Sequence, residues 1–313
     1  MKMVSIIIPV FNAERYIDQC LSALLNLDYP KDKYEIIIVD NGSTDKTVEI
    51  VARYPVKSFV LPKVTISQLR NFGGVQAKGD IFAFIDADCV APSLWLKKST
   101  EFLENEKIGA VGSWYQLPSK TSFLERVWNA HMSSRRLKMG DIDWVPSGNL
   151  IVTKSVYHKI GGFNETLTTS EDIDICQRIH LSGACVFTHP ELAVIHLGES
   201  KNLKQFLLKE KWRGEGVLQN VIREFPHIKF NKAIGFTGMT FLALIGIFVS
   251  WGVHDYVLLN SSLLFLFLIP LYLTIKACNV SHQWRYGMPL MFLFVLYSFA
   301  RILSVFNPRV WKK

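Results

Sequence analysis

The sequence predicts an α/β domain followed by an α-helical membrane region. Short apolar runs alternate with segments of helical periodicity over the first 90 residues, which is typical of a parallel sheet with helices on both faces. Two long stretches without charged residues begin after residue 232. Basic residues gather around these stretches, whereas the α/β part is nearly neutral.

The first part of the chain contains a regular succession of strands and helices. The apolar runs predict strands at 4–10, 35–40, 57–61 and 80–86, and the periodic segments predict helices at 14–27, 46–53 and 67–78. Asn12 is a candidate N-cap of the first helix. Because ligands of parallel sheets collect at the carboxyl ends of the strands, Asp40 and Asp86 stand where a ligand would bind.

The next part, from Ala110 to Val194, has a less regular pattern. It contains short apolar runs, a loop from Trp144 to Asn149 and a helix predicted over 171–182. Ser170 precedes that helix as a candidate N-cap. We expect this part to supply the remaining wall of the site.

The composition excludes several classes of protein. Apolar residues make up 49% and charged residues 20% of the 313 residues, which excludes disordered and low-complexity chains. The net charge of +8 would suit nucleic acid, but from residue 231 onward seven basic residues accompany one acid, Asp255. Basic residues beside apolar stretches are typical of contact with anionic lipid, so membrane lipid is the expected partner and nucleic acid is not. Five cysteines without paired spacing indicate reduced thiols.

The last third of the chain is expected to bind and cross a membrane. Residues 201–232 form an amphipathic juxtamembrane segment rich in Lys, Arg, Trp and Phe, which suits a helix on an anionic surface. Ala233–His254 and Tyr256–Ile275 are 22 and 20 residues long and uncharged, enough to span a bilayer core of about 30 Å. A third run, Tyr286–Pro308, contains Arg301. It either spans as well, re-enters, or lies in the interface with Arg301 reaching toward water.

The distribution of basic residues predicts the orientation. The lead-in to the first span is basic, Lys276 and Arg285 follow the second span, and the turn near Asp255 has no Lys or Arg. By the positive-inside rule, this places residues 1–230 in the cytoplasm, on the inner side of the cytoplasmic membrane.

Carboxylates at the ends of predicted elements are the candidate functional residues. Asp86-Ala87-Asp88 follows a strand, where it is either a solvated turn or a site that holds a hard cation together with phosphate oxygens. Glu171 and Asp172 open a helix, whose N-terminal dipole stabilises negative charge. That position suits a general base and equally suits helix capping.

Five ordered motifs give the chain a family resemblance. They are IIIPVFNAE (Ile6–Glu14), IIVDNGSTD (Ile37–Asp45), LRNFGGVQAKGD (Leu69–Asp80), DAD (Asp86–Asp88) and SEDIDICQRI (Ser170–Ile179). Together they resemble the family 2 glycosyltransferases over residues 4–200. The resemblance implies the A-type, Rossmann-like fold of that family, and inverting transfer of a sugar from a nucleotide-sugar donor.

The resemblance assigns a donor pocket to residues near the first strands. In this interpretation Pro9, Phe11 and Glu14 line the base and ribose pocket. Asp40 would hydrogen-bond the base, commonly uracil, and Arg70 would lie near the nucleotide. The expected donor is therefore a UDP-sugar.

The same resemblance assigns metal and catalytic roles to the carboxylates. Asp88 would coordinate Mg²⁺ or Mn²⁺ bridging the diphosphate, and Asp86 would contact the ribose or a metal-bound water. His196, where family members often carry a histidine, is either a further metal contact or an ordinary strand-end histidine. Asp172 would be the general base that deprotonates the acceptor hydroxyl, with Glu171 beside it.

The expected function is transfer of one sugar to a lipid-linked saccharide or polyprenyl acceptor in surface-polysaccharide assembly. Gln205–Gly214 has the residue types of the Q-x-x-R-W motif of processive synthases in the wrong order, and two or three helices can hardly enclose a polymer channel. Transfer to polyprenyl monophosphate and a catalytically silent scaffold are the alternatives. The expected domains are a catalytic domain over 1–200, the juxtamembrane segment over 201–232 and a membrane region with two to three helices over 233–313.

Overall fold

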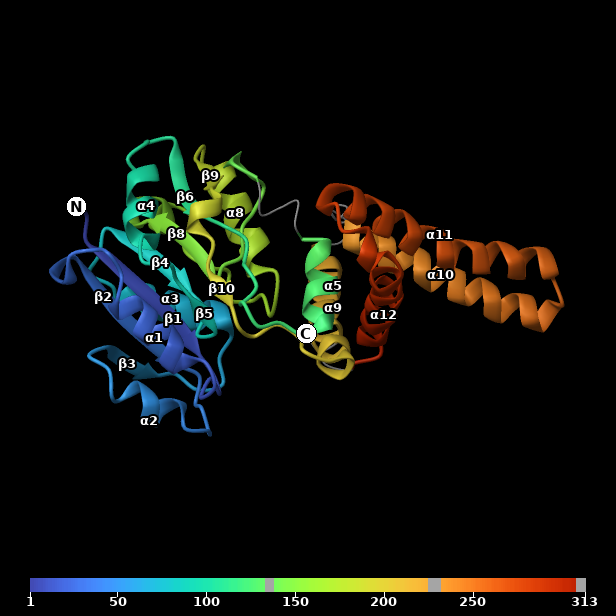
Figure 1. Ribbon diagram of the computed structural model, residues 1–313, viewed down its shortest axis with the longest axis horizontal. Coiled ribbons are helices and arrows are strands. Elements are labelled where there is room, and N and C mark those ends of the chain that lie inside the picture. The colour runs from blue at the N-terminus through green and yellow to red at the C-terminus, as the bar shows by residue number, and fades with distance from the viewer. Residues whose placement is uncertain (133–137, 225–231, 308–313) are drawn as a thin grey trace. The chain divides into compact units, whose positions relative to one another are not determined.

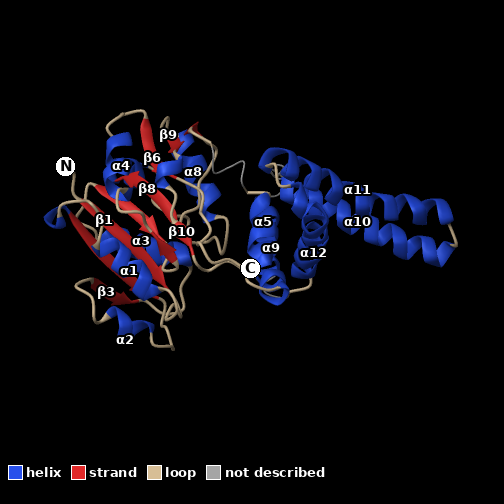
Figure 2. Cartoon of the chain, viewed as in Figure 1, coloured by secondary structure: helices blue, strands red, loops and turns tan. Residues whose placement is uncertain are grey.

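The computed structural model describes residues 1–132, 138–224 and 232–307. The chain divides into two compact units, one of residues 1–119 and 135–199 and the other of residues 120–134 and 200–313. Figure 1 colours the chain from its N-terminus to its C-terminus. Among the described residues, the strands all belong to the first unit (Figure 2).

A mixed eight-stranded sheet is the centre of the first unit. The strands are β1 (Val4–Val10), β2 (Tyr34–Asp40), β3 (Lys57–Val60), β4 (Ile81–Ile85), β5 (Cys89–Val90), β6 (Ile108–Gly112), β7 (Gly140–Asp141), β8 (Asn149–Thr153), β9 (Cys185–Thr188) and β10 (Ile195–His196). The large sheet has the order β3-β2-β1-β4-β8-β6-β9-β7. The remaining strands, β5 and β10, form a separate two-stranded sheet.

The parallel strands predicted for the first part are confirmed, but the sheet as a whole is mixed. Strands β3, β2, β1 and β4 run parallel to one another. Strand β8 runs antiparallel to both β4 and β6. The regular alternation of strands and helices, which predicts parallel strands, ends with β4. The later strands are joined by connections long enough to allow either direction.

Helices cover both faces of the large sheet. The helices of one face are α1 (Ile17–Leu25), α2 (Thr47–Val51) and α4 (Trp95–Phe102). The helices of the other face are α3 (Ile66–Gln76), α7 (Lys154–Lys159) and α8 (Glu171–Leu181). The first unit also contains two 3₁₀ turns, η1 (Lys31–Lys33) and η2 (Pro190–Leu192). Ile6 and Ile8 of β1 pack into the core of the first face, and Ile7 packs into the core of the second. Because successive side chains of a strand point to opposite faces, two apolar cores require an unbroken apolar run.

The parallel register brings predicted site residues to one edge of the sheet. Val10 of β1 pairs with Asp40 of β2, and β4 ends one residue before Asp86. The carboxyl ends of neighbouring parallel strands meet at the same edge. Asp40 and Asp86 therefore lie on that edge, as their places in the sequence predict.

Of the two predicted helix caps, Asn12 is wrong, and Ser170 has the predicted position without a capping hydrogen bond. Helix α1 begins only at Ile17, and Asn12 has a φ of 49° while its side-chain oxygen accepts from the Thr44 N–H at 2.8 Å. Ser170 does precede α8, but its φ is 64° and its side chain makes no cap hydrogen bond. Both residues have a positive φ, whereas an N-cap residue is typically extended.

The regular elements of the second unit, in the part that the structure describes, are all helices or 3₁₀ turns. Its elements are α5 (Phe123–Ala130), α9 (Leu203–Glu224), α10 (Lys232–Val253), α11 (Tyr256–Ser281), the 3₁₀ turn η3 (Trp284–Tyr286) and α12 (Gly287–Val305). Helix α5 belongs to this unit although it comes much earlier in the chain, since Val127 and Ala130 share a buried core with Phe206 and Phe294. No pattern in the sequence predicts this grouping.

Three helices of this unit are long and apolar enough to cross a membrane. They are Gly235–Val253, Tyr256–Ser281 and Trp284–Val305. The first two correspond to the uncharged stretches found in the sequence. Residues 225–231 of the predicted juxtamembrane segment and Pro308 of the third run lie outside the described residues.

Arg301 of the third helix is paired within the protein. Its guanidinium lies 3.1 Å from Glu210 of α9, whose side chain is 1% exposed, and Arg213 donates to the other oxygen of Glu210 at 2.6 Å. Burial alone would raise the pKa of Glu210, but Arg213 and Arg301 outweigh burial and lower it. The carboxylate is therefore charged at neutral pH and joins α9 to α12.

Replacing Glu210 by alanine is expected to destabilise the second unit by about 3 kcal/mol, because the change leaves Arg301 buried without its partner. Thermal unfolding in detergent measures this, and Glu104→Ala, a change of an exposed glutamate, is the control. The pKa of Glu210 is lowered in the folded protein. The greater stability of the wild-type protein relative to Glu210→Ala is therefore present at neutral pH and is lost as the pH falls through that lowered pKa. Equal unfolding temperatures of the wild-type protein and Glu210→Ala would contradict this role.

Candidate active site

Asp40 uses its carboxylate to hold the turn that follows β2. It is 4% exposed and accepts from the N–H groups of Gly42 and Ser43 at 2.8 Å each. Gly42 has a φ of 80°, which glycine adopts without strain and which this tight turn requires. The end of β2 is therefore rigid beside the end of β1.

The loop after β1 carries the other predicted donor-pocket residues. Pro9 is buried within β1, and Phe11, which follows it, is 58% exposed. Glu14 accepts from the N–H of Lys46 at 3.1 Å, which ties this loop to the one after β2. An exposed aromatic ring beside a rigid polar turn can stack on a planar ligand.

Arg70 is the buried centre of a second group of predicted site residues. It lies on α3, is 1% exposed, and donates to Asp86 at 2.8 Å and to Glu171 at 2.9 Å. Its guanidinium carbon lies 5.3 Å from the centre of the Phe163 ring. Burial alone would lower the pKa of Arg70, but Asp86 and Glu171 raise it above its usual value. A permanently charged arginine therefore joins a strand-end carboxylate to a helix-start carboxylate.

Asp86 is held from two sides. Arg70 donates to its Oδ1, and the Tyr115 hydroxyl donates to its Oδ2 at 3.2 Å. A Cβ on Gly148 would fall 2.0 Å from that Oδ2, so a larger residue there would displace the carboxylate. Burial and then the charge of Asp86 raise the pKa of Tyr115 well above its usual value, so this hydroxyl keeps its proton and remains a donor.

Asp88 is enclosed by the segment from His196 to Glu199. Strand β10 pairs antiparallel with β5, which places His196 opposite Cys89. The Nε2 atom of His196 lies 3.3 Å from Asp88 Oδ2, and its Nδ1 atom lies 3.2 Å from Glu199 Oε1. A Cβ on Gly198 would lie 1.8 Å from Asp88 Oδ2. The backbone thus approaches this carboxylate as closely as only a glycine permits.

The groups around Asp88 fit a divalent cation. Asp88, Cys89 and His196 offer ligand atoms that lie within 4.8 Å of one another. Burial raises the pKa of Cys89 well above its usual value, so the thiol stays protonated and is a poor ligand. Against the effect of burial, Asp88 and Glu199 raise the pKa of His196 to about 9, so a cation that binds the imidazole has to displace a proton from it. A carboxylate suits Mg²⁺ and Mn²⁺, and an imidazole favours the transition metal of the two.

The two acids that open α8 have different surroundings. Glu171 is buried, and its Oε1 accepts from both Arg70 and the Ser147 hydroxyl at 2.9 Å. Asp172 is half-buried, and its Oδ1 accepts from the N–H of Ile173 at 2.8 Å. Glu171 is therefore charge-paired and fixed, and Asp172 is the more accessible acid.

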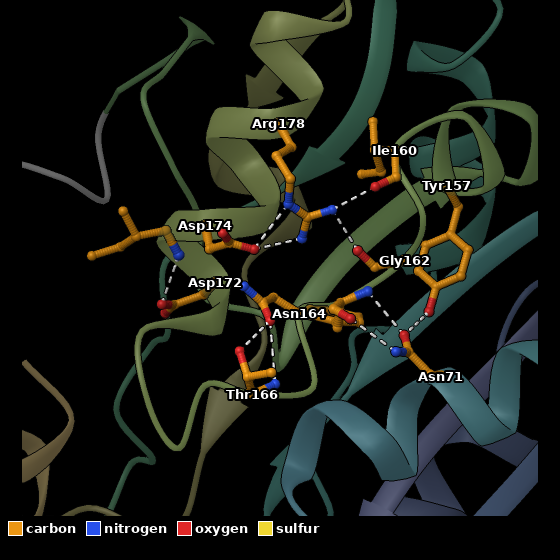
Figure 3. A network of polar contacts seen from close by, with 11 residues as sticks. Asn71, Tyr157, Ile160, Gly162, Asn164, Thr166, Asp172, Asp174 and Arg178 are labelled. Atoms are coloured by element: carbon orange, nitrogen blue, oxygen red, sulfur yellow. Dashed lines mark hydrogen bonds and ion pairs between the residues drawn. The ribbon is translucent and has the colours of Figure 1, made fainter. Parts of the chain in front are cut away.

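A side chain of α3 holds the loop between α7 and α8 (Figure 3). Asn71 donates to the Phe163 carbonyl at 2.9 Å and accepts from the Phe163 N–H at 2.8 Å and the Tyr157 hydroxyl at 2.5 Å. Gly162 has a φ of 70°, and a Cβ there would lie 2.8 Å from Asn71 Oδ1. The loop therefore needs glycine at this position for both its backbone and its space.

Arg178 anchors the same loop from α8. It donates to the carbonyls of Ile160 at 2.8 Å and Gly162 at 2.6 Å, and it pairs with Asp174 one turn earlier at 2.5 Å (Figure 3). These bonds fix the path by which the chain enters α8. The position of Asp172 in the first turn of α8 depends on this path.

Two residues that the sequence analysis did not single out lie against the predicted ones, Tyr115 beside Asp86 and Glu199 beside His196. Gly148 beside Asp86 and Ser147 beside Glu171 belong to the loop from Trp144 to Asn149, in the part of the chain that was expected to supply the remaining wall of the site. A single sequence carries no signal for Tyr115, because its partner is distant along the chain. The H-x-x-E spacing of His196 and Glu199 is a signal that the sequence does contain.

The mixed sheet with acids at its edge is that of the A-type glycosyltransferases. The structure resembles that of the mannosyltransferase PcManGT from Pyrobaculum calidifontis, solved in complex with GDP-Man and Mn²⁺, with a TM-score of 0.64 and 17% identity over 97% of this chain and 87% of that one. Residues 5–163 match the family described as Glycosyl transferase family 2, and the chain belongs to that family. The resemblance found in the sequence motifs is confirmed.

Two similar proteins are glycosyltransferases by name. Glycosyltransferase AglE of Haloferax volcanii is 28% identical over 225 residues, which are 69% of this chain and 73% of that protein. A Methanococcus voltae protein is 28% identical over 228 residues, 66% of this chain and 70% of its own length. It is named dolichyl N-acetyl-alpha-D-glucosaminyl phosphate 3-beta-D-2,3-diacetamido-2,3-dideoxy-beta-D-glucuronosyltransferase. Family membership makes this chain a glycosyltransferase.

Replacing Asn71 by alanine is expected to loosen the loop between α7 and α8 and to lower the free energy of unfolding by about 2 kcal/mol, because buried polar groups lose their partner. Tyr157→Phe removes one of these bonds and should cost less. Thermal unfolding and limited proteolysis of the loop measure both changes. Asn26→Ala, which removes an exposed bond to the Ser22 carbonyl, is the control. If the loop of Asn71→Ala is cleaved at the same rate as that of the wild-type protein, Asn71 does not anchor it.

Proposed function

We propose that this chain is a membrane-anchored, inverting glycosyltransferase that moves one sugar from a UDP-sugar to a lipid-linked saccharide in cell-surface polysaccharide assembly. The observation that carries the proposal is the buried Arg70, which ties Asp86 at the sheet edge to Glu171 at the start of α8. In the family pattern these two acids belong to the donor side and the acceptor side of the reaction. One arginine therefore links the two sides.

The nucleotide is proposed to bind at the ends of β1 and β2. The exposed ring of Phe11 offers a stacking surface, bordered by Pro9 and Glu14. Asp40 is an acceptor of the kind that a uracil N–H requires. Arg70 is buried and charge-paired, so we propose that it positions Asp86 and does not itself contact the nucleotide.

The donor diphosphate is proposed to bind together with Mg²⁺ or Mn²⁺. Asp88 and His196 would hold the cation, and Asp86 is fixed beside them by Arg70 and Tyr115. When bound, a divalent cation supplies positive charge that stabilises the departing diphosphate. The Mn²⁺ in the PcManGT complex supports this assignment.

Asp172 is proposed to be the general base. It takes the proton of the acceptor hydroxyl while that oxygen forms a bond to the anomeric carbon of the donor sugar. The bond from this carbon to the diphosphate breaks, and the nucleoside diphosphate leaves with the electron pair. A single displacement of this kind inverts the anomeric configuration. Glu171, charge-paired with Arg70, fixes the helix start that presents Asp172.

The acceptor is proposed to be attached to a lipid. Three helices able to cross a membrane favour this, as does the dolichyl phosphate in the name of the Methanococcus voltae relative. In this proposal residues 1–200, apart from residues 120–134 that belong to the helical unit, are the catalytic domain on the cytoplasmic face of the cytoplasmic membrane, 201–232 the juxtamembrane segment and 233–313 the membrane region. The basic residues beside the spans support that orientation.

Asp172→Asn is expected to reduce sugar transfer by at least about 10²-fold, because an amide cannot accept the acceptor proton. Donor affinity should stay close to that of the wild-type protein, since the base acts on the acceptor. Transfer assays and calorimetric titration with UDP measure the two quantities, with Asp143→Asn, a change of an exposed aspartate, as control. A large loss of UDP affinity in Asp172→Asn would show that its role is misassigned.

Mn²⁺-dependent hydrolysis of a panel of nucleotide sugars by the detergent-purified full chain tests the donor proposal. One UDP-sugar is expected to be cleaved slowly by water, and Asp88→Asn should abolish the cleavage because the cation is no longer held. Cleavage that survives Asp88→Asn removes Asp88 from the site. Absence of any binding of UDP contradicts the proposed function itself.

A further inference from the structure

The segment that closes over Asp88 ends in an acid, Glu199, for which the proposed function has no use. We propose that Glu199 is a positioning residue that orients His196 as a ligand of the bound cation. This inference rests on the metal site of the proposed function. It concerns a residue that acts through the histidine and does not itself touch the cation.

The two ring nitrogens of His196 face different carboxylates. Nε2 lies 3.3 Å from Asp88, and Nδ1 lies 3.2 Å from Glu199. A neutral imidazole carries its proton on one nitrogen and a lone pair on the other, and a carboxylate accepts the proton-bearing side. Once a cation occupies the Asp88 side, Glu199 therefore selects the form with the proton on Nδ1. The Nε2 lone pair then points toward Asp88 and the cation.

Other contacts already hold the His196 backbone and ring plane. Its N–H donates to the Gln116 carbonyl at 3.0 Å, and the N–H of Leu197 donates to the Asp88 carbonyl at 2.8 Å. The Tyr115 ring stacks on the imidazole with 4.5 Å between centres and 15° between planes. His196 is 7% exposed. What Glu199 adds is the choice of protonated nitrogen, since the position of the segment is secured without it.

This arrangement is one that metal sites use generally. A histidine ligand usually donates its second N–H to a carboxylate, and loss of that partner costs about 10- to 100-fold in metal affinity. The chain offers a matched comparison in His189 and Glu191, whose Nδ1 and Oε2 atoms lie 3.7 Å apart. The Glu191 carboxylate also approaches Lys98 at 4.0 Å. Among the ion pairs of the described residues, His189 has one acid beside it, whereas His196 has two.

The experiment measures Mn²⁺ binding to the full-length protein in detergent and in the presence of UDP, from the electron paramagnetic resonance signal of free Mn²⁺. Glu199→Ala is expected to raise the dissociation constant for Mn²⁺ about 10- to 100-fold, whereas Glu191→Ala should leave it unchanged. In the His196→Ala background, Glu199→Ala should have no further effect, because its influence passes through the imidazole. Glu199→Leu, which keeps much of the side-chain volume and has no acceptor, serves as the second variant if thermal unfolding shows that Glu199→Ala does not fold.

The outcomes separate this inference from the proposed function. Wild-type Mn²⁺ affinity in a folded Glu199 variant overturns the inference. An equal loss in the wild-type and His196→Ala backgrounds also overturns it, since Glu199 would then act on the cation directly. If the wild-type protein and Asp88→Asn bind Mn²⁺ equally poorly, the metal site of the proposed function fails and the inference fails with it.

Discussion

Burial of the Arg70 guanidinium between Asp86 and Glu171 constrains the first unit of this protein. A buried cation is tolerated only when it is paired, and removing one partner costs about 3–5 kcal/mol. The end of β4 and the start of α8 therefore cannot separate without exposing or orphaning a charge. The loop from α7 to α8 therefore joins two fixed ends. Asn71 and Arg178 anchor its backbone by hydrogen bonds.

Close backbone approach completes what the ion pairs begin. Gly148 and Gly198 bring the chain against the carboxylates of Asp86 and Asp88, at distances that no side chain allows. Tyr115 contacts both parts of this arrangement, because its hydroxyl binds Asp86 and its ring stacks on His196. The polar groups at the sheet edge are thus oriented before any ligand arrives, and such preorganisation is what charge stabilisation in an active site requires.

The helical unit also contains an arginine whose charge is paired within the protein. An arginine in an otherwise apolar helix is costly unless a partner meets it. Glu210 of α9 supplies that partner to Arg301 and is itself satisfied by Arg213. An amphipathic helix and an apolar one are therefore joined by charge as well as by packing, which the composition of either helix alone does not indicate.

Local pattern was sufficient for the strands that end at Asp40 and just before Asp86, for the uncharged helices and for the family, because periodicity, composition and motif order are properties of short segments. The partners of each side chain were not accessible in this way. Only the tertiary structure placed Arg70 in a buried bridge, gave Asn12 and Ser170 a positive φ, made β8 antiparallel and grouped α5 with the C-terminal helices. Each of these depends on contacts between residues far apart in the chain, and no single sequence specifies which distant side chain will meet a given one.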